Sequence, residues 1–243
     1  MERGHTHPIS QFIREVSGIF VDMGFTVATG PELEQEFYNF DALNVASDHP
    51  SRDMQDTFWV KTNKPREAFV GPDGRSYKPV MRTQTSAVQV RFLEKHKDSL
   101  PCAVVVPGKV FRNEATDATH EAEFYQLEAL YVDKDVSLGH LKGVVEHFLK
   151  KLYGDDVEMR FRPSYFPFVE PGVEVDVKFR GKWLEMGGAG MVHPNVLRAA
   201  GIDPLEWRGF AFGFGVDRLV MLRHDITDIR LLYSGDLRFV NQF

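Results

Sequence analysis

The sequence Gly-Phe-Ala-Phe-Gly-Phe-Gly-Val-Asp-Arg at residues 209–218 constrains the fold of this chain more than any other stretch. Its glycines, at positions 209, 213 and 215, allow a neighbouring strand or a ligand to approach the backbone closely. Apolar residues then recur at helical spacing from Val216 to Leu222, which predicts a helix that begins beside the Asp-Arg pair. An arginine at such a place can stack on an aromatic ligand or bind a phosphate through its forked guanidinium.

The hydrophobic periodicity of the rest of the chain predicts both helices and strands. Helical spacing predicts helices over residues 9–23, about 86–96, 138–152 and 194–201, with Thr85 or Ser86 and Ser137 as N-caps of the second and third. Short alternating or apolar runs predict strands at 25–28, 57–60, 104–107, 111–114, 127–132, 157–163, 173–180 and 182–187, and an apolar strand or tail at 237–243. The sum predicts an α+β domain, an antiparallel sheet flanked by helices.

Composition narrows the class of protein. The chain has 243 residues, of which 43% are apolar, enough for one domain with a packed core. A net charge of −6 does not favour binding of nucleic acid by this chain on its own, because the phosphate backbone is itself negatively charged. The single cysteine, Cys102, beside an apolar run, predicts a buried thiol and a reducing compartment. With no membrane span or signal peptide in the sequence, we expect a cytoplasmic protein.

Two polar segments at period two predict a ligand-binding sheet surface. Arg112 and Glu114 are two residues apart, and Phe124, Gln126 and Glu128 follow beyond a polar loop. The alternative is a solvated face that happens to carry one phenylalanine. The sequence has no Gly-x-x-x-x-Gly-Lys-Ser/Thr phosphate loop, no dinucleotide fingerprint and no zinc-ligand spacing, so a nucleotide would have to be bound by arginines and this surface.

A third segment, Phe166-Pro167-Phe168, is most simply a stretch of irregular core. Its two phenyl rings could instead wall a pocket for an aromatic ligand. Gly187–Gly190 is a weak signal of close ligand approach, and His5, His7 and His193 are better explained as structural than as ligands of a metal or substrate.

In this order the segments resemble the three signature motifs of class II aminoacyl-tRNA synthetases: Gly30-Pro31, then Phe111–Glu114 with Phe124–Glu128, then residues 209–218. Longer ordered stretches resemble the catalytic domain of the phenylalanine–tRNA synthetase α subunits of the bacterial or organellar type. The stretches that carry this resemblance are residues 53–59, 82–86, 107–112, 117–120, 162–168, 174–177, 190–197 and 209–213.

The resemblance implies activation of phenylalanine with ATP, in the presence of Mg²⁺, and transfer of the phenylalanyl group to tRNA(Phe). By the same resemblance, the catalytic residues would be Arg112, His120 and Arg218, and the ATP-binding residues would be Arg112, Glu114, Phe124 and Arg218. The phenylalanine-binding residues would be Trp59, Gln84, Ser86, Gln126, Glu128, Phe166, Phe168 and Ala211. Metal ligands are not identified.

The resemblance also implies partners: a β subunit, and a second copy of this chain contacted through the first motif within an α2β2 assembly. Two departures qualify these expectations. Gln84 stands where the family usually has histidine, and residues 1–243 correspond to the catalytic domain without the family's N-terminal tRNA-binding coiled coil. Together with the negative charge, the second departure predicts weak tRNA binding by this chain alone. The competing hypotheses are a synthetase-like binding or regulatory protein without aminoacylation activity, and a class II enzyme for a related amino acid.

Overall fold

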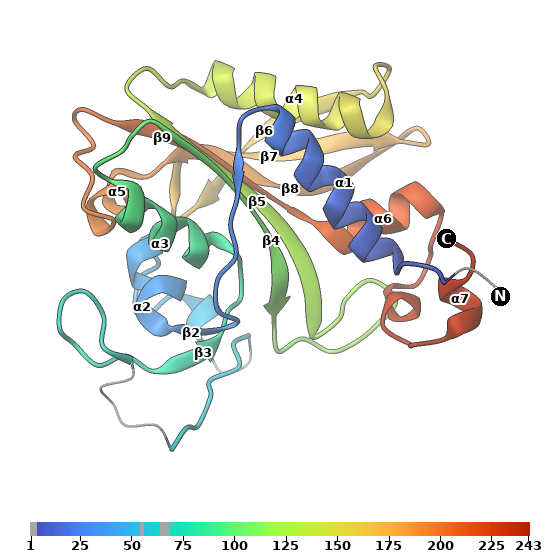
Figure 1. Cartoon of the computed structure of the whole chain (residues 1–243), viewed down its shortest axis with the longest axis horizontal. Helices are drawn as coiled ribbons and strands as arrows, with labels where there is room; N and C mark the ends of the chain where they lie inside the picture. Colours follow the sequence, from blue (N-terminus) through green and yellow to red (C-terminus); the bar gives the residue numbers. More distant parts are fainter. Residues whose placement is uncertain (1–3, 54–55, 64–68) are drawn as a thin grey trace.

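The computed structural model describes residues 4–53, 56–63 and 69–243, and its centre is a seven-stranded sheet (Figure 1). The strand order is β1-β4-β5-β9-β8-β7-β6. Every adjacent pair is antiparallel except β1 and β4, which run parallel. The strands are β1 (Thr26–Val27), β4 (Cys102–Phe111), β5 (Glu123–Asp133), β6 (Met159–Phe166), β7 (Val169–Phe179), β8 (Lys182–Val192) and β9 (Arg208–Gly215). The α+β prediction of an antiparallel sheet is therefore confirmed, with one parallel pair at an edge.

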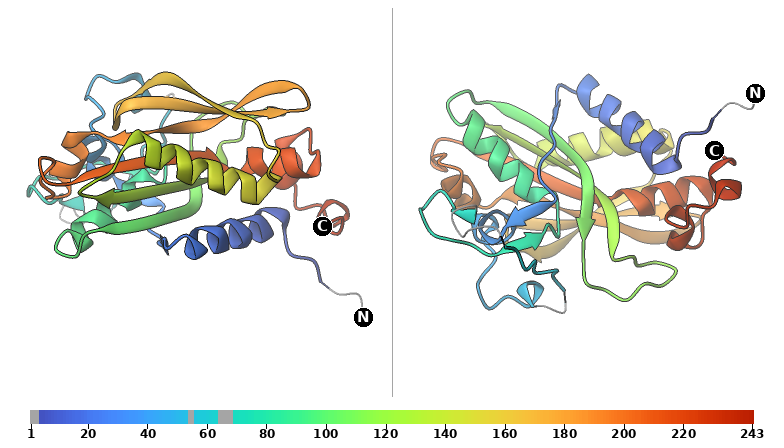
Figure 2. Two further views of the ribbon diagram at one scale, coloured as in Figure 1. Left: turned by 90° about the horizontal axis from the view of Figure 1, so that it is seen from above. Right: turned by 60° about the horizontal axis from the view of Figure 1, so that its bottom comes forward.

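Helices cover both faces of this sheet (Figures 1 and 2). On one face lie α1 (Pro8–Asp22), α4 (Leu138–Tyr153) and α6 (Val216–His224), and the other face carries α3 (Ser86–His96) and α5 (Pro194–Ala199). The shorter elements are α2 (Glu36–Asn39), α7 (Leu237–Val240), the 3₁₀ turns η1 (Asp41–Leu43), η2 (Pro50–Arg52) and η4 (Ile229–Leu232), and the two-stranded sheet of β2 (Leu33–Gln35) and β3 (Pro79–Met81). No helix in the described part of the chain is long and apolar enough to cross a lipid bilayer.

The period of two in the central strands separates two hydrophobic cores. In β4, Val105 packs into the core beneath α1, α4 and α6, whereas Val104 and Val106 pack into the core beneath α3 and α5. In β9 the phenylalanines at 210, 212 and 214 belong to the first core, so the small residues between them face the opposite side. The Phe/Gly alternation of residues 209–215 thus fills one face of the sheet and leaves room on the other.

The predicted N-cap residues of α3 and α4 are confirmed, whereas most predicted strand bounds differ from the structure by several residues. Ser137 caps α4 in a reciprocal capping box with His140. Thr85 is the N-cap of α3, but its hydroxyl makes no capping hydrogen bond. Cys102 is half-buried rather than fully buried, and that burial raises the pKa of its thiol to about 11, which leaves it protonated at neutral pH.

Three strand predictions are wrong. Residues 57–60 form a single isolated bridge, Trp59 to Val80, flanked by backbone hydrogen bonds of Val60 to Pro79 and of Met81 to Phe58. Strand β4 ends at Phe111, so residues 112–114 belong to the loop that follows. Residues 237–240 form helix α7, because the side chain of Asp236 caps it by accepting a 2.8 Å hydrogen bond from the backbone N–H of Arg238. Met54 and Gln55, part of one stretch that carried the family resemblance, lie outside the described residues.

Candidate active site

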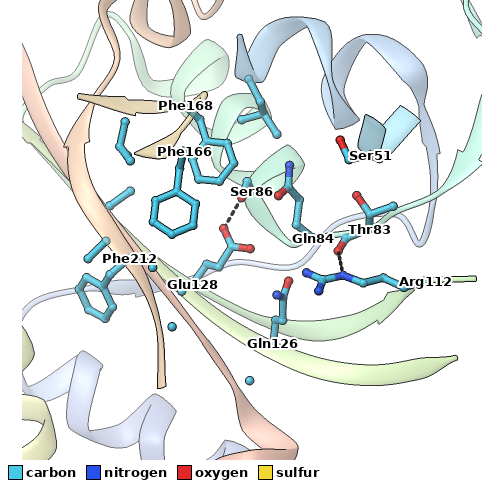
Figure 3. Close-up of a pocket in the computed structure, with 18 of the residues that line it drawn as sticks. Ser51, Thr83, Gln84, Ser86, Arg112, Gln126, Glu128, Phe166, Phe168 and Phe212 are labelled. Atoms are coloured by element: carbon cyan, nitrogen blue, oxygen red, sulfur yellow. Dashed lines mark hydrogen bonds between the residues drawn. The ribbon is translucent and has the colours of Figure 1, made fainter. Parts of the chain in front are cut away.

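The sheet face that carries α3 and α5 is hollowed by a cavity of about 710 Å³ (Figure 3). This volume is within the range of about 300–1,000 Å³ typical of small-molecule sites. On β5, alternate residues share this face: Leu130 lies in the core, whereas Glu128, Gln126 and Phe124 line the cavity further along the strand. The predicted polar sheet surface is therefore confirmed for Phe124, Gln126 and Glu128, and it is the floor of a pocket rather than a solvated face. Arg112 and Glu114, predicted to share it, reach the cavity from the loop after β4 instead.

The predicted site residues converge on this cavity with one exception. Its lining includes Gln84, Ser86, Arg112, Glu114, His120, Phe124, Gln126, Glu128, Phe166, Phe168, Ala211 and Arg218. Trp59 is absent from the lining: its ring stacks on Phe40 with centroids 6.1 Å apart, and its indole N–H donates to the Arg52 carbonyl at 3.3 Å. The expected contact of Trp59 with the site is not made in this structure, because its ring packs against the core beneath α3 and α5 instead.

We define the amino-acid end of the cavity by Ser86, Glu128, Phe166, Phe168 and Ala211. Its polar centre is the carboxylate of Glu128, which is 7% exposed. One oxygen accepts the backbone N–H of Thr85 at 3.0 Å, and the other accepts the Ser86 hydroxyl in a short hydrogen bond (Figure 3). The carboxylate thus lies at the N-terminus of α3, where the helix dipole favours negative charge, and it accepts the N–H of the N-cap residue itself.

Burial raises the pKa of the Glu128 carboxyl, and the hydrogen bonds from Ser86 and Thr85 oppose that shift. A buried carboxylate with no cation beside it is costly, so a positively charged ligand group placed here would gain a strong interaction. Across the described residues Glu128 makes no ion pair.

The phenyl rings of Phe166 and Phe168 stack on one another with centroids 6.0 Å apart and planes inclined by 22° (Figure 3). They stand at the end of β6 and in the turn to β7, and they line the cavity together with Ala211 of β9. Glycines on the neighbouring strands leave the space that the Phe166 and Glu128 side chains occupy. A Cβ on Gly188 would lie 2.7 Å from the Phe166 ring, and one on Gly213 would lie 2.8 Å from the Glu128 side chain.

Glutamine side chains complete this end of the cavity. Gln84 donates a weak 3.4 Å hydrogen bond to the Asn39 carbonyl, and the side-chain oxygen of Gln126 is buried without a partner. Gln89, which the sequence analysis did not identify, also lines the cavity and leaves its side-chain nitrogen buried and unpaired. It lies three residues after Ser86 on the same helix, so the helical repeat could have indicated it. Unpaired buried amides of this kind are available to a polar ligand.

We define the nucleotide end by Arg112, Glu114, His120, Phe124 and Arg218. Arg112 lies over the Phe124 ring, 5.0 Å from its centroid, and its Nε donates a long 3.5 Å hydrogen bond to the Thr83 carbonyl (Figure 3). Burial lowers the pKa of Arg112, which nevertheless stays charged at neutral pH. Arg218, in the first turn of α6, is exposed and donates to the Glu185 carbonyl at 2.7 Å.

The loop between β4 and β5 brings Glu114 and His120 to the mouth of the cavity, and both side chains are exposed. His120 contacts the Asp117 carboxylate at 3.0 Å. A hydrogen bond from the Thr119 N–H, followed by one from His120, holds the pKa of Asp117 well below its usual range, so the Asp117 carboxyl is ionised at neutral pH. Across residues 4–53, 56–63 and 69–243, no group of three or more His, Cys, Asp or Glu side chains is arranged to hold a metal ion.

The cavity therefore joins a buried anion and stacked phenyl rings at one end to arginines and an aromatic ring at the other, as an amino acid joined to a nucleotide requires. Residues 1–243 match the sequence profile of the tRNA synthetases class II core domain (F). A phenylalanine–tRNA ligase alpha subunit from Synechocystis sp. is 50% identical over 99% of this chain and 68% of its own length. The chain belongs to the phenylalanine–tRNA ligase alpha-subunit family.

Two further phenylalanine–tRNA ligase alpha subunits are similar to this chain. The one from Chlorobium chlorochromatii is 50% identical over 99% of this chain and 70% of its own length. The one from Bacillus subtilis is 47% identical over 99% of this chain and 69% of its own length. The resemblance drawn from the sequence, both to class II synthetases and to this family within them, is confirmed.

Proposed function

We propose that this chain activates L-phenylalanine with ATP to phenylalanyl-adenylate and transfers the phenylalanyl group to tRNA(Phe), as the catalytic part of an alpha subunit. A single observation carries the proposal: one cavity combines the buried Glu128 carboxylate, the Phe166–Phe168 wall, and the side chains of Arg112, Phe124 and Arg218. Membership of the phenylalanine–tRNA ligase alpha-subunit family supports the same substrates.

At the amino-acid end, the substrate ammonium would bind Glu128, with the Ser86 hydroxyl and the free oxygen of Gln126 as further partners. Gln84 supplies an uncharged amide beside them where the resemblance led us to expect histidine. The phenyl group would pack on Phe166 and Phe168 and end at Ala211. A tyrosine hydroxyl at that apolar end would lose its hydrogen bonds to water without gaining a partner, which disfavours tyrosine.

In the first reaction a carboxylate oxygen of phenylalanine attacks the α-phosphorus of ATP, a new P–O bond forms, and pyrophosphate leaves with the electron pair of the bond that breaks. Arg112 would neutralise the charge on the α-phosphate and the attacking carboxylate. Adenine would lie between Phe124 and Arg218, Glu114 would accept from its amino group, and His120 would contact the phosphates. In the second reaction a ribose hydroxyl of tRNA(Phe) attacks the carbonyl carbon, and AMP leaves.

Mg²⁺ would enter with ATP and be held chiefly by its phosphates, because the described residues offer no ready-made cluster of ligands. It would offset phosphate charge, while positioning is left to the side chains named above. The β subunit, and a second copy of this chain contacted through Gly30 and Pro31, remain the expected partners. Arg82 supports that segment from inside by donating to the carbonyls of Gly30 at 3.1 Å and Pro31 at 3.4 Å.

The test is amino-acid-dependent pyrophosphate–ATP exchange on the purified chain, with phenylalanine, with tyrosine and with no amino acid. We expect exchange with phenylalanine alone, and charging of tRNA(Phe) once a β subunit is added. Absence of exchange with phenylalanine, both alone and with the β subunit, would contradict the proposal and favour a synthetase-like protein without this activity.

A further inference from the structure

Asp217 is a buried carboxylate to which the proposed reaction assigns no role. It stands in the first turn of α6, is 2% exposed and borders the cavity. One oxygen accepts the backbone N–H of Tyr125 at 2.6 Å, and the other accepts the hydroxyl of Tyr233 in a short hydrogen bond. In the described part of the chain Asp217 makes no ion pair, so these two bonds are the main compensation for burying its charge.

The first of these bonds lies where the sheet ladder ends. The last pair between β5 and β9 is Gln126 with Gly215, because β9 passes into α6 at that point. The Tyr125 N–H lies one residue beyond that last pair. The side chain of Asp217 accepts it and so continues the connection between β5 and the chain that follows β9.

The position of this bond matters because each partner is next in sequence to a residue of the nucleotide end. Tyr125 follows Phe124, and Asp217 precedes Arg218. A hydrogen bond between these neighbours fixes the backbones that carry both side chains relative to one another. The Asp217–Tyr125 hydrogen bond therefore helps to fix the spacing of the backbone positions from which the Phe124 and Arg218 side chains extend.

Tyr233, which lies outside the three class II signature motifs, holds the Asp217 side chain in place through its hydroxyl. It follows η4 and is half-buried. The same segment also contacts the loop between β4 and β5, since the Ile229 N–H donates to the Ala118 carbonyl at 2.9 Å. Residues 229–233 thus contact the loop that carries His120 and the helix that carries Arg218.

We infer that Asp217 and Tyr233 form a positioning pair that holds Phe124 and Arg218 at the spacing needed to bind adenine. The inference rests on the proposed role of those two residues in nucleotide binding. Tyr233 does not line the cavity, and both oxygens of Asp217 are occupied by Tyr125 and Tyr233, so removing the Tyr233 hydrogen bond weakens adenine binding through position and leaves the phenylalanine end unaltered.

The chain provides a matched control in Tyr153. Its hydroxyl also donates to α6, to the Leu219 carbonyl at 3.4 Å, but it does not contact Asp217. Tyr233→Phe and Tyr153→Phe therefore each delete one hydroxyl that contacts the same helix. Only the first removes a partner of Asp217.

The experiment measures adenosine binding by calorimetry for wild type, Tyr233→Phe, Asp217→Asn and Tyr153→Phe, together with KM for ATP and for phenylalanine in pyrophosphate exchange. We expect Tyr233→Phe to weaken adenosine binding and raise KM for ATP by about three- to tenfold, the scale of one ordinary hydrogen bond, because the lost bond acts on the nucleotide end indirectly. KM for phenylalanine should stay within about twofold, Asp217→Asn should act in the same direction, and Tyr153→Phe should resemble wild type.

Unchanged adenosine binding in Tyr233→Phe, an equal loss in Tyr153→Phe, or an equal rise in KM for phenylalanine would overturn the inference. If Asp217→Asn does not fold, Tyr233→Phe alone decides. A wild-type chain that binds adenosine but exchanges no pyrophosphate with phenylalanine would contradict the proposed function, while the adenosine affinities would still test the positioning pair.

Discussion

At the amino-acid end of the cavity, Glu128 is buried and both its oxygens are already hydrogen-bonded, and Phe166 and Phe168 already stack on one another. At the nucleotide end, Arg218, Glu114 and His120 are exposed, and Arg218 donates to a backbone carbonyl that a ligand would have to replace. The first end is preorganised, whereas the second would have to rearrange to bind ATP as proposed. This difference predicts that substrate selectivity resides in the amino-acid end, and that the nucleotide end supplies charge at the moment of reaction.

The largest effect should come from removing the charge closest to the reacting atoms. Arg112→Ala should lower kcat for pyrophosphate exchange by about 10²–10³-fold, the scale of losing one preorganised group that stabilises a transition state. Arg238→Ala is the control, because Arg238 is an exposed arginine paired with Asp236 on the far C-terminal helix. A decrease in kcat of less than about threefold in Arg112→Ala would show that Arg112 does not stabilise the transition state.

Glu128→Gln tests the preorganised end. It should raise KM for phenylalanine by about 10- to 100-fold through loss of a charge-assisted hydrogen bond to the ammonium, with little change in KM for ATP. Glu123→Gln is the matched control on the same strand, because Glu123 is more exposed and pairs with Lys109. An equal rise in KM for ATP and for phenylalanine in Glu128→Gln would show that the two ends of the cavity do not bind their substrates independently.

The raised pKa of Glu128 predicts a pH dependence of the same interaction. Protonation neutralises the carboxyl at a higher pH than for an ordinary glutamate, so phenylalanine binding weakens as pH falls through that raised pKa. Below it, KM for phenylalanine should rise by about tenfold per pH unit. The same titration of Glu128→Gln should be flat over this range, and a parallel rise would assign the effect to another group.

Ala211→Gly should deepen the apolar pocket opposite Phe166 and Phe168 and leave the rest of the site unchanged. The ratio of kcat/KM for 4-chlorophenylalanine to that for phenylalanine should rise by about tenfold, the lower end of the range for one methyl-sized group in an apolar pocket. If larger para-substituted analogues are still refused, Ala211 does not set the depth of the pocket.

The smallest of these effects is expected for an exposed residue of the rearranging end. Arg218→Ala removes one side of the proposed adenine sandwich and should raise KM for ATP by about three- to tenfold, as for a partly solvated cation–π contact. KM for phenylalanine should not change. An unaltered dependence on ATP concentration would show that Arg218 does not bind the base.

The same comparison explains what could be predicted from the sequence. Residues such as Gln126 and Glu128 were identified because a strand repeats every two residues and one face must be satisfied. Register and long-range hydrogen bonds have no local signal, so the contacts of Asp217 with Tyr125 and Tyr233, 92 and 16 residues away, were missed. Trp59 was assigned to the site through the resemblance, but its surrounding segment has no periodicity that could have indicated where its ring points.

The C-terminal segment was misassigned for a related physical reason. An apolar run from Leu237 onward is compatible with a short strand or a short helix, and the decision came from the Asp236 cap. The N-cap of α3 is Thr85, one of the two candidates that the sequence offered, but the group that bonds it is Glu128 from β5. In both cases the element was easier to predict than the contact that fixes it.

The most direct test of this account is a crystal structure of the chain with a non-hydrolysable phenylalanyl-adenylate analogue. We predict its phenyl ring between Phe166, Phe168 and Ala211, its ammonium on Glu128, and its adenine between Phe124 and Arg218, with Arg218 released from the Glu185 carbonyl. An analogue bound in the opposite direction, or an ammonium that does not contact Glu128, would contradict the assignment of the two ends of the cavity.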